Sequence, residues 1–228
     1  MTLEVPRKEV FRYLGYRGVE PSPEVAELVE RCVSRLQEVA EPRAVQACFP
    51  LEIMDDGVLS FGGLQVKSQS LLKNLSGCVE VCMLAVTIGA GVDRLIRQAE
   101  VGRMSEAVIY QAAGAAMVEE FCEQCNAEIR VSAQARGLSC RPRFSPGYGD
   151  FALEHQRLFL QILNAAKRIG VCLSDSLLMT PSKSITAVIG LYKEDSTSTV
   201  DASLDAEPGH ACEHCGCPDC QFRENSGK

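Results

Sequence analysis

The sequence predicts an α+β fold in which helices pack on a mixed or antiparallel sheet, followed by a flexible cysteine-rich tail at the C-terminus. Two observations lead to this prediction. Segments with helical and with strand periodicity are interleaved without a regular repeat, as in layered α+β structures. After Tyr192 the composition turns polar and acidic before four cysteines follow in close succession. We therefore expect one domain over residues 1–192, an acidic linker over 193–209 and a cysteine-rich tail over 210–228.

The first part of the domain contains a helix and a hairpin. From Pro23 onwards, apolar residues repeat with helical spacing. Ser22 can cap this helix, and proline favours its first position. Residues 45–53 then alternate between apolar and polar side chains and lead through Asp55-Asp56-Gly57 to a second apolar run at 58–61. This pattern predicts a β-hairpin.

The rest of the domain contains further segments with the periodicity or composition of a regular element. A glycine ends the first of these helices, and the alanine-rich start of the longest one predicts close packing on its neighbours. In chain order we expect a helix over 68–75, a strand over 78–87, a helix over 91–101, a long helix over about 105–137, a helix over 154–170 and a strand over 184–192.

Charge and hydropathy exclude several classes of protein. The formal net charge of −7 argues against a protein that binds the phosphate backbone of nucleic acids, which normally presents a basic face. The N-terminal residues are charged and lack the apolar run of a signal peptide. The longest apolar stretch, residues 78–92, is shorter than a membrane span and contains Glu80. We expect a cytoplasmic protein without nucleic-acid or membrane partners.

The twelve cysteines fall into two groups. Eight of them, from Cys32 to Cys172, lie in apolar or helical contexts and are expected to act as small buried hydrophobes. Among these, the Cys122-x-x-Cys125 spacing is typical of redox motifs, but its place within the long helix favours packing.

The other four cysteines form Cys212-x-x-Cys215-x-Cys217-x-x-Cys220 in the tail. Four thiolates can hold zinc or an iron–sulfur cluster, although a single residue between the two pairs makes the geometry cramped. A disordered, redox-sensitive tail and a thiol pair that exchanges with a partner are the alternatives.

Two weaker signals favour structural interpretations. The stretch from Thr87 to Arg94 resembles the start of a dinucleotide fingerprint, but Arg94 stands where the third glycine is needed, so we expect only a glycine turn that leads into a helix. No metalloprotease, phosphate-loop or nucleophile-elbow motif is present. His155, early in a helix, is assigned no role, and no residue is predicted to be catalytic.

The loop RPRFSPGYGDF, residues 141–151, is the strongest candidate for a ligand site. Its prolines restrict the backbone, while Gly147 and Gly149 permit conformations and close approaches that a side chain would block. Arg143 can bind a carboxylate with two hydrogen bonds, and Tyr148 offers an aromatic face. The alternative is that Arg143 and Tyr148 only fasten a rigid connection to the sheet. The residues alone leave both interpretations open.

Several of these segments together resemble a known family. They are RFSPGY at 143–148 with the helix after it, MTPSKS at 179–184, IGLY at 189–192 and, before them, GAAMVEEFCEQCNAEIR at 114–130. In order and spacing they are similar to the activation, or reactivation, domain of cobalamin-dependent methionine synthase, in particular to its free-standing relatives. The resemblance covers about residues 105–192 and is weak over the N-terminal half.

The resemblance implies a function in methionine biosynthesis. Proteins of this family bind S-adenosylmethionine and present its methyl group to cobalamin. When the cofactor has lapsed into inactive cob(II)alamin, a reductant supplies one electron and S-adenosylmethionine remethylates the cobalt. The protein mostly positions the reactants.

The resemblance also implies which residues bind the ligand. Arg143 should hold its carboxylate, the backbone from Ser145 to Gly147 should approach its nucleoside and amino-acid portions, and Tyr148 should lie beside it. The remaining candidates are Tyr192, at the end of the last strand, and Glu119, for the cationic side of the ligand. Where the full-length enzyme continues with a Pro-small-Cys run, this chain has Gly149-Asp150-Phe151. An N-terminal acidic contact of that enzyme has no counterpart here.

The chain lacks the Asp-x-His-x-x-Gly motif that binds cobalamin, so a corrinoid must arrive on another protein. We expect an activator that acts in trans on a corrinoid-bearing methionine synthase or a related methyltransferase, with an electron donor such as a flavodoxin or ferredoxin. The tail would deliver the electron or dock the reductant. Two alternatives stay open: a module that binds S-adenosylmethionine or docks a corrinoid protein without turnover, and a redox protein that uses the cysteine tail.

Overall fold

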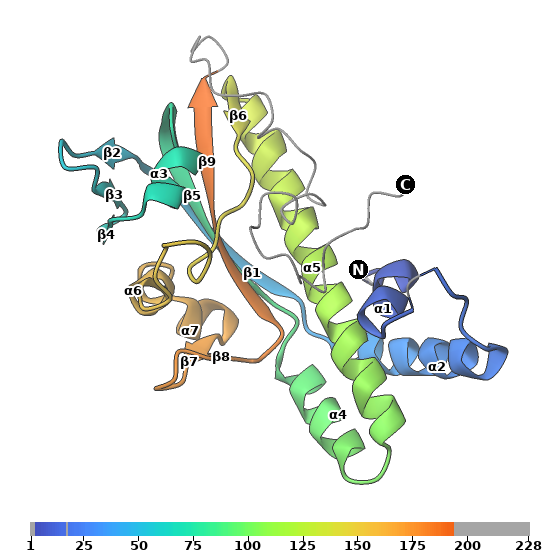
Figure 1. Ribbon diagram of the computed structural model, residues 1–228. Helices are drawn as coiled ribbons and strands as arrows, with labels where there is room; N and C mark the ends of the chain where they lie inside the picture. Colours follow the sequence, from blue (N-terminus) through green and yellow to red (C-terminus); the bar gives the residue numbers. More distant parts are fainter. Residues whose placement is uncertain (1–2, 17, 194–228) are drawn as a thin grey trace.

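The computed structural model describes residues 3–16 and 18–193 (Figure 1). The predicted linker and the cysteine-rich tail lie outside these residues. The helices are α1 Arg7–Tyr13, α2 Pro23–Val39, α3 Gln69–Asn74, α4 Ala90–Glu100, α5 Met104–Gln134, α6 His155–Ile162 and α7 Ala165–Ile169. The strands are β1 Arg43–Pro50, β2 Glu52–Ile53, β3 Leu59–Phe61, β4 Leu64–Val66, β5 Cys78–Thr87, β6 Leu138–Cys140, β7 Cys172–Leu173, β8 Met179–Thr180 and β9 Ser184–Lys193.

An antiparallel sheet in the order β1-β5-β9-β6 forms the centre of the structure. Strands β5 and β9 are ten residues long, and nearly all their side chains are buried. They are buried because helices and loops cover both faces of the sheet, which explains why their sequences are apolar runs without alternation. The α+β fold predicted from the sequence is confirmed.

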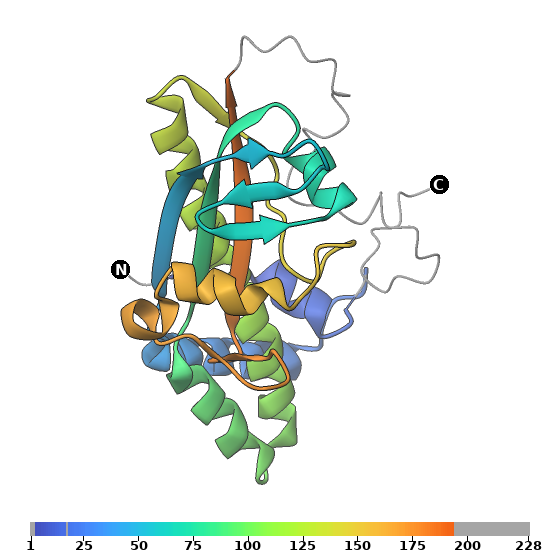
Figure 2. The same ribbon diagram turned by 90° about the vertical axis from the view of Figure 1, so that its left-hand side faces the viewer.

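The two faces of the sheet bury two separate cores. Residues such as Leu84 and Ile189 point toward α5, which is joined there by α1, α2 and α4. Residues such as Met83 and Val188 point to the other side, where α6, α7 and the small sheet β2-β3-β4 cover them. Figure 2 shows this small sheet and α6 lying across the long strands. The strict alternation of a strand assigns neighbouring residues to opposite cores.

The helices of the first core pack closely at glycines. A Cβ atom on Gly91 would lie 2.3 Å from the carbonyl oxygen of Val39 at the end of α2. Gly89, with φ of 87°, makes the turn into α4. The interpretation of this stretch as a glycine turn is therefore confirmed. On α5, Gly114 leaves room for the side chain of Lys183, whose Cε would lie 3.2 Å from an added Cβ.

Three predictions need correction. The hairpin expected over residues 45–61 does not form as one unit, because β1 pairs with β5 in the central sheet and only the short β2 pairs with β3. The helix expected over 154–170 is two helices, because Asn164 adopts a left-handed conformation with φ of 50° between α6 and α7. Asparagine tolerates this conformation better than most residues. The eight cysteines are not all buried, since Cys48 and Cys172 are exposed and Cys140 is partly exposed. The helix α1, the strands β4 and β6 and the hairpin β7–β8 were not predicted from the sequence.

The other predicted elements are found close to their expected bounds. Ser22 accepts a hydrogen bond from the amide of Val25 at 3.5 Å and caps α2. Strand β9 runs to Lys193, one residue beyond the predicted end of the domain. Within residues 3–16 and 18–193, no helix is both long enough and apolar enough to cross a membrane.

Candidate functional site

A cavity of about 780 Å³ lies between α4 and α5 on one side and the loop 141–154, α6, the hairpin β7–β8 and the start of β9 on the other. Both polar and apolar side chains line it. Its lining includes Asp93, Glu119, Ser145, Tyr148, Gln156 and Thr186. Among the described residues that line it, the carboxylates of Asp93, Glu100 and Glu119 outnumber the single cation of Arg97. Such a lining favours a ligand with positive charge.

Asp93 fixes the segment before β9 to α4. Its side chain is buried, and its carboxylate accepts hydrogen bonds from the amide of Ser182 at 2.8 Å and from the Ser182 hydroxyl at 2.6 Å. Burial lowers the pKa of the neighbouring Lys183, and the Asp93 charge opposes this shift. The segment therefore enters β9 in a fixed position beside the cavity.

Gln156 places a buried amide at the wall of the cavity. Its residue is only 3% exposed, and its Nε2 lies 3.3 Å from the hydroxyl of Thr186 on β9. An amide has two N–H donors and a carbonyl oxygen with two lone pairs, so this single bond leaves one donor and the oxygen for other partners. Because both residues line the cavity, those groups are available to a ligand.

The loop 141–151 is held to the sheet by backbone hydrogen bonds. Phe144 and Val188 bond each other in both directions at 2.9 and 2.7 Å, and Arg141 donates to Gly190 at 2.8 Å. The chain then turns at Gly147, whose φ is 96° and whose amide donates to Phe151 at 2.7 Å. These bonds bring Ser145 and Tyr148 to the cavity, where Tyr148 stays 63% exposed.

Asp150 ties the same loop to the start of α3. Its carboxylate accepts hydrogen bonds from the Ser68 hydroxyl at 2.5 Å and from the amides of Gln69 and Ser70 at 2.7 and 3.0 Å. The Ser68 hydroxyl and these amides hold the pKa of Asp150 well below its ordinary value. The departure from the family pattern at this position therefore has a structural role, because Asp150 completes the cap of a helix that is distant in sequence.

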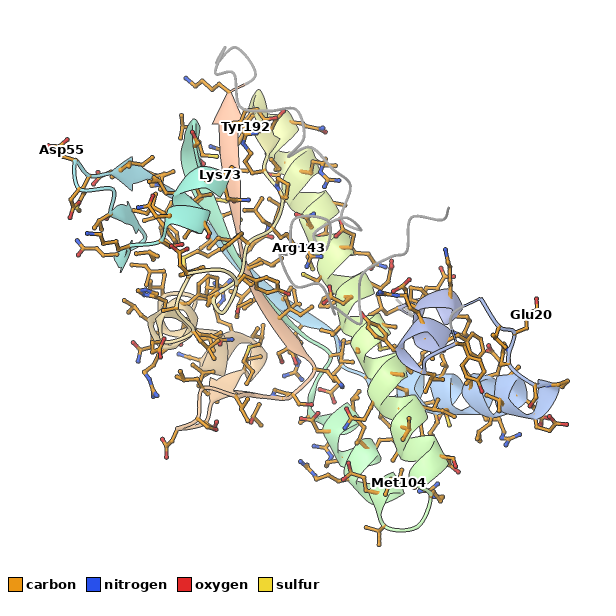
Figure 3. The ribbon with its side chains drawn as sticks, in the orientation of Figure 1. Glu20, Asp55, Lys73, Met104, Arg143 and Tyr192 are labelled. Atoms are coloured by element: carbon orange, nitrogen blue, oxygen red, sulfur yellow. The ribbon has the colours of Figure 1, made fainter. Side chains whose placement is uncertain are left out.

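Arg143 lies beside α5 in the middle of the structure (Figure 3). Its guanidinium is 3.3 Å from the carboxylate of Glu123 and 3.6 Å from that of Glu119, and it donates to the sulfur of Cys122 at 2.8 Å. Burial lowers its pKa, but Cys122 and the two glutamates raise it more, so the group stays charged. The fold thus brings Arg143 and Glu119, which are far apart in the sequence, into contact.

Tyr192 lies at the opposite end of β9 from the cavity (Figure 3). The guanidinium of Arg141 stacks over its ring at 4.4 Å from the centroid. Of the six predicted binding residues, Glu119, Ser145 and Tyr148 line the cavity, Arg143 contacts Glu119, and Gly147 makes the adjoining turn. Tyr192 is not brought together with them.

Three residues of the cavity wall were not predicted from the sequence as site residues: Asp93, Gln156 and Thr186. The sequence does contain a pattern that could have identified Gln156. It shares a helical face with Phe159, Leu160 and Leu163, all of which are buried. A polar side chain on an otherwise apolar helical face is a candidate for a buried polar role.

The described residues contain no group of three or more histidine, cysteine, aspartate or glutamate side chains suited to a metal ion. Cys122 and Cys125 are buried, and burial raises the pKa of Cys122 to about 12 and that of Cys125 to about 11. The packing interpretation of this pair is confirmed. The predicted ligands Cys212, Cys215, Cys217 and Cys220 lie outside the described residues.

Comparison with known structures bears out the fold expected from the resemblance. The crystal structure of the MetH reactivation domain bound to AdoHcy superposes with a TM-score of 0.63, at 16% sequence identity, over 85% of this chain and 76% of that chain. The likeness extends beyond residues 105–192, into the N-terminal half where the sequence resemblance is weak. No protein-family model matches the sequence, and no curated protein is similar enough to indicate a family.

Proposed function

We propose that the chain binds S-adenosylmethionine in the 780 Å³ cavity and presents its methyl group to a corrinoid carried by another protein. The observation that supports this most is the convergence of Glu119, Ser145 and Tyr148 on one cavity, in the fold of a domain that has been crystallised with AdoHcy. The volume is in the range of small-molecule and cofactor sites.

The chemistry of the lining suits a zwitterionic sulfonium ligand. The carboxylates of Asp93 and Glu119 favour the positive sulfur and the ammonium group. Tyr148 offers an aromatic face, which attracts cations. The free donor and acceptor of Gln156 match the edge of an adenine ring, which glutamine side chains also bind in nucleic acids.

Arg143 and Glu119 would receive the amino-acid portion of the ligand. Their ion pair, at 3.6 Å, is longer than a tight charge-assisted hydrogen bond. A ligand carboxylate at Arg143 and a ligand ammonium at Glu119 would replace one loose contact with two charge-assisted ones. Glu123, at 3.3 Å, would keep Arg143 in position.

Methyl transfer requires the protein mainly to position the two reactants. The S–CH₃ bond breaks, its electron pair stays on sulfur, and the methyl carbon is taken by the electron-rich metal of a reduced corrinoid. No proton moves, so no general acid or base is required. Holding the two reactants in line is where the protein accelerates the step. The apolar side chains Tyr148, Leu153 and Leu178 line the cavity and remain exposed, which leaves a surface for the incoming partner.

Calorimetric titration with S-adenosylmethionine tests the binding step. We expect saturable binding by the wild-type chain and a loss of about 1.5–3 kcal/mol in the Arg143→Ala and Glu119→Gln variants, because each removes a hydrogen bond to a charged group. Glu128→Gln, an exposed position on the same helix, is the matched control and should bind normally. Absence of binding by the wild-type protein would rule the proposal out.

Transfer of the methyl group to a reduced corrinoid protein, supplied with an electron donor of the flavodoxin or ferredoxin type, tests the second step. Binding without transfer would leave a docking module as the function. For the tail we propose zinc or an iron–sulfur cluster at Cys212, Cys215, Cys217 and Cys220. Metal analysis and an absorption spectrum of anaerobically purified protein, with Cys215→Ser for comparison, test it. A metal-free, redox-inert protein would remove both the metal site and the redox alternative.

A further inference from the structure

Cys48 and Cys82 face each other across strands β1 and β5. Neither residue lines the cavity. The ladder between β1 and β5 ends at Pro50 and Glu80. In the next pair, the amide of Leu51 donates to the carbonyl of Val79 at 3.0 Å, so Leu51 and Val79 form a hydrogen-bonded pair. The two kinds of pair alternate along an antiparallel ladder, and Cys48 and Cys82 lie three steps away. They therefore form a non-hydrogen-bonded pair, in which the side chains are closest.

The backbone of such a pair is already spaced for a disulfide. The Cα atoms of a non-hydrogen-bonded pair lie about 4.5 Å apart, within the range of about 4.4–6.8 Å found in disulfides. Directly opposite side chains also lie on the same face of the sheet. A side-chain interaction between the two thiols also shifts the pKa of each, as expected for side chains directly opposite each other.

The two thiols differ in their access to solvent. Cys48 is exposed on the edge strand of the sheet, whereas Cys82 is completely buried in the core beneath α5. An external reagent can therefore reach Cys48 first, and Cys82 can be reached only through it. An exposed attacking thiol next to a buried second thiol is the arrangement that thiol–disulfide exchange requires.

The interaction with Cys82 favours a reactive Cys48. The hydrogen bond with Cys82 lowers the pKa of Cys48 to about 7. Burial and the charge of Glu80 act in the opposite direction, and Arg136 adds a smaller lowering effect. Glu80 and Arg136 form an ion pair with each other, which limits the effect of both. The hydrogen bond and burial raise the pKa of Cys82, which keeps it protonated until Cys48 has reacted. Cys140 is a third thiol near this pair.

We propose that Cys48 and Cys82 form a thiol–disulfide exchange site for low-molecular-weight disulfides. The Cys48 thiolate attacks one sulfur of the reagent, a mixed disulfide forms, and the other half of the reagent leaves as a thiolate. Cys82 then loses its proton and attacks the Cys48 sulfur, which releases the second half. Two protein thiols are oxidised to one disulfide, the reagent is reduced to two thiols, and the two protons go to these products.

Oxidation of this site would fasten the edge strand β1 to β5 with a covalent bond. Cys172 offers a natural comparison. It is also exposed and lies in an antiparallel pair, but the residue opposite it is Thr180, so it can form a mixed disulfide and cannot resolve it across the strands.

The test uses the full chain, fully reduced and then incubated without oxygen with glutathione disulfide at pH 7. Remaining thiols are alkylated, and the cysteine-containing peptides are identified by mass spectrometry. Wild type should give a peptide in which Cys48 is joined to Cys82. Cys82→Ser should instead accumulate glutathione on Cys48, because the resolving thiol is missing, and Cys48→Ser should give neither product. Cys172→Ser, the control, should behave like wild type.

The initial rate gives a second measure. At pH 7 Cys48 should react about threefold faster than the cysteine of an unstructured peptide, because its larger thiolate fraction outweighs the weaker nucleophilicity of a less basic thiolate. Persistent glutathionylation of Cys48 in wild type, pairing of Cys48 with another cysteine, or no reaction at Cys48 would each overturn the proposal. The failure or success of S-adenosylmethionine binding has no bearing on this result.

Discussion

Gln156 is a single polar side chain that brings the otherwise apolar, core-facing side of α6 to the cavity. Its neighbours on the same face of α6 serve the core, whereas its amide bonds Thr186 and faces the cavity. A buried amide is costly unless its groups are paired, so a ligand that completes its hydrogen bonds gains affinity.

We expect Gln156→Leu to weaken S-adenosylmethionine binding by about 1–3 kcal/mol, on the order of tenfold to a hundredfold in Kd, because the ligand loses a partner in a water-poor site. Calorimetry measures this loss. Gln161→Leu, at an exposed position of the same helix, should leave Kd unchanged. Equal affinities of the two variants would show that Gln156 does not contact the ligand.

Asp150 makes the stability of the protein depend on pH. The pKa of its carboxyl is lower in the folded protein than in the unfolded chain, so its stabilising effect is fully present above about pH 4, the unfolded value. The effect is lost as the pH falls toward the folded pKa.

The Asp150→Asn variant should therefore melt at a lower temperature than wild type at pH 7, and the difference should shrink as the pH is lowered below about 4. Thermal denaturation monitored by circular dichroism checks this. Asp175→Asn, an exposed aspartate in the β7–β8 turn, is the control. A difference in melting temperature that grows on acidification would contradict the assigned role.

At the level of elements, contacts between helices decide what local propensity leaves open. Glycine within a helix is normally unfavourable, and Gly91 is retained in α4 because α2 ends against it. Similarly, Asn164 ends α6 where the sequence continues with good helix formers. The chain turns there so that α7 can pack on β1 and β5.

We expect Gly91→Ala to destabilise the fold by about 1–3 kcal/mol, since the new Cβ would lie 2.3 Å from the carbonyl oxygen of Val39. Helix propensity alone predicts the opposite sign, a gain of about 1 kcal/mol. Urea denaturation distinguishes the two. Gln98→Ala, on the exposed side of α4, should change stability by less than about 0.5 kcal/mol.

At the scale of the whole molecule, the central sheet separates the two cores. The cavity lies at the start of β9, in this sheet. A ligand there contacts α4, α5, the loop 141–154 and α6 together. Binding should consequently stabilise the entire domain and not one element.

At a concentration of about 100 times Kd, S-adenosylmethionine should stabilise the folded state by about 2.7 kcal/mol, which corresponds to a rise in Tm of about 5–10 °C for a domain of this size. Scanning calorimetry with increasing ligand measures the shift. Gln156→Leu should shift much less at the same concentration. A constant Tm at saturating ligand would contradict binding to the native state.

The sequence by itself determined the elements whose signals are local. The cap at Ser22, the apolar runs of β5 and β9 and the alanine-rich start of α5 each carry their own evidence within a few residues. The glycines of the loop 141–151 also predicted its turns, because only the backbone angles of those residues were at issue. The family resemblance added the fold and the expected ligand.

Only the tertiary structure decided which distant residues meet. Glu119 and Ser145 share a cavity because α5 and the loop pack on the same sheet, while Tyr192, on the same strand as Thr186, is carried away by the length of β9. Cys48 faces Cys82 because of the register of two strands. Register and packing depend on contacts between segments far apart in the chain, and no local pattern encodes them.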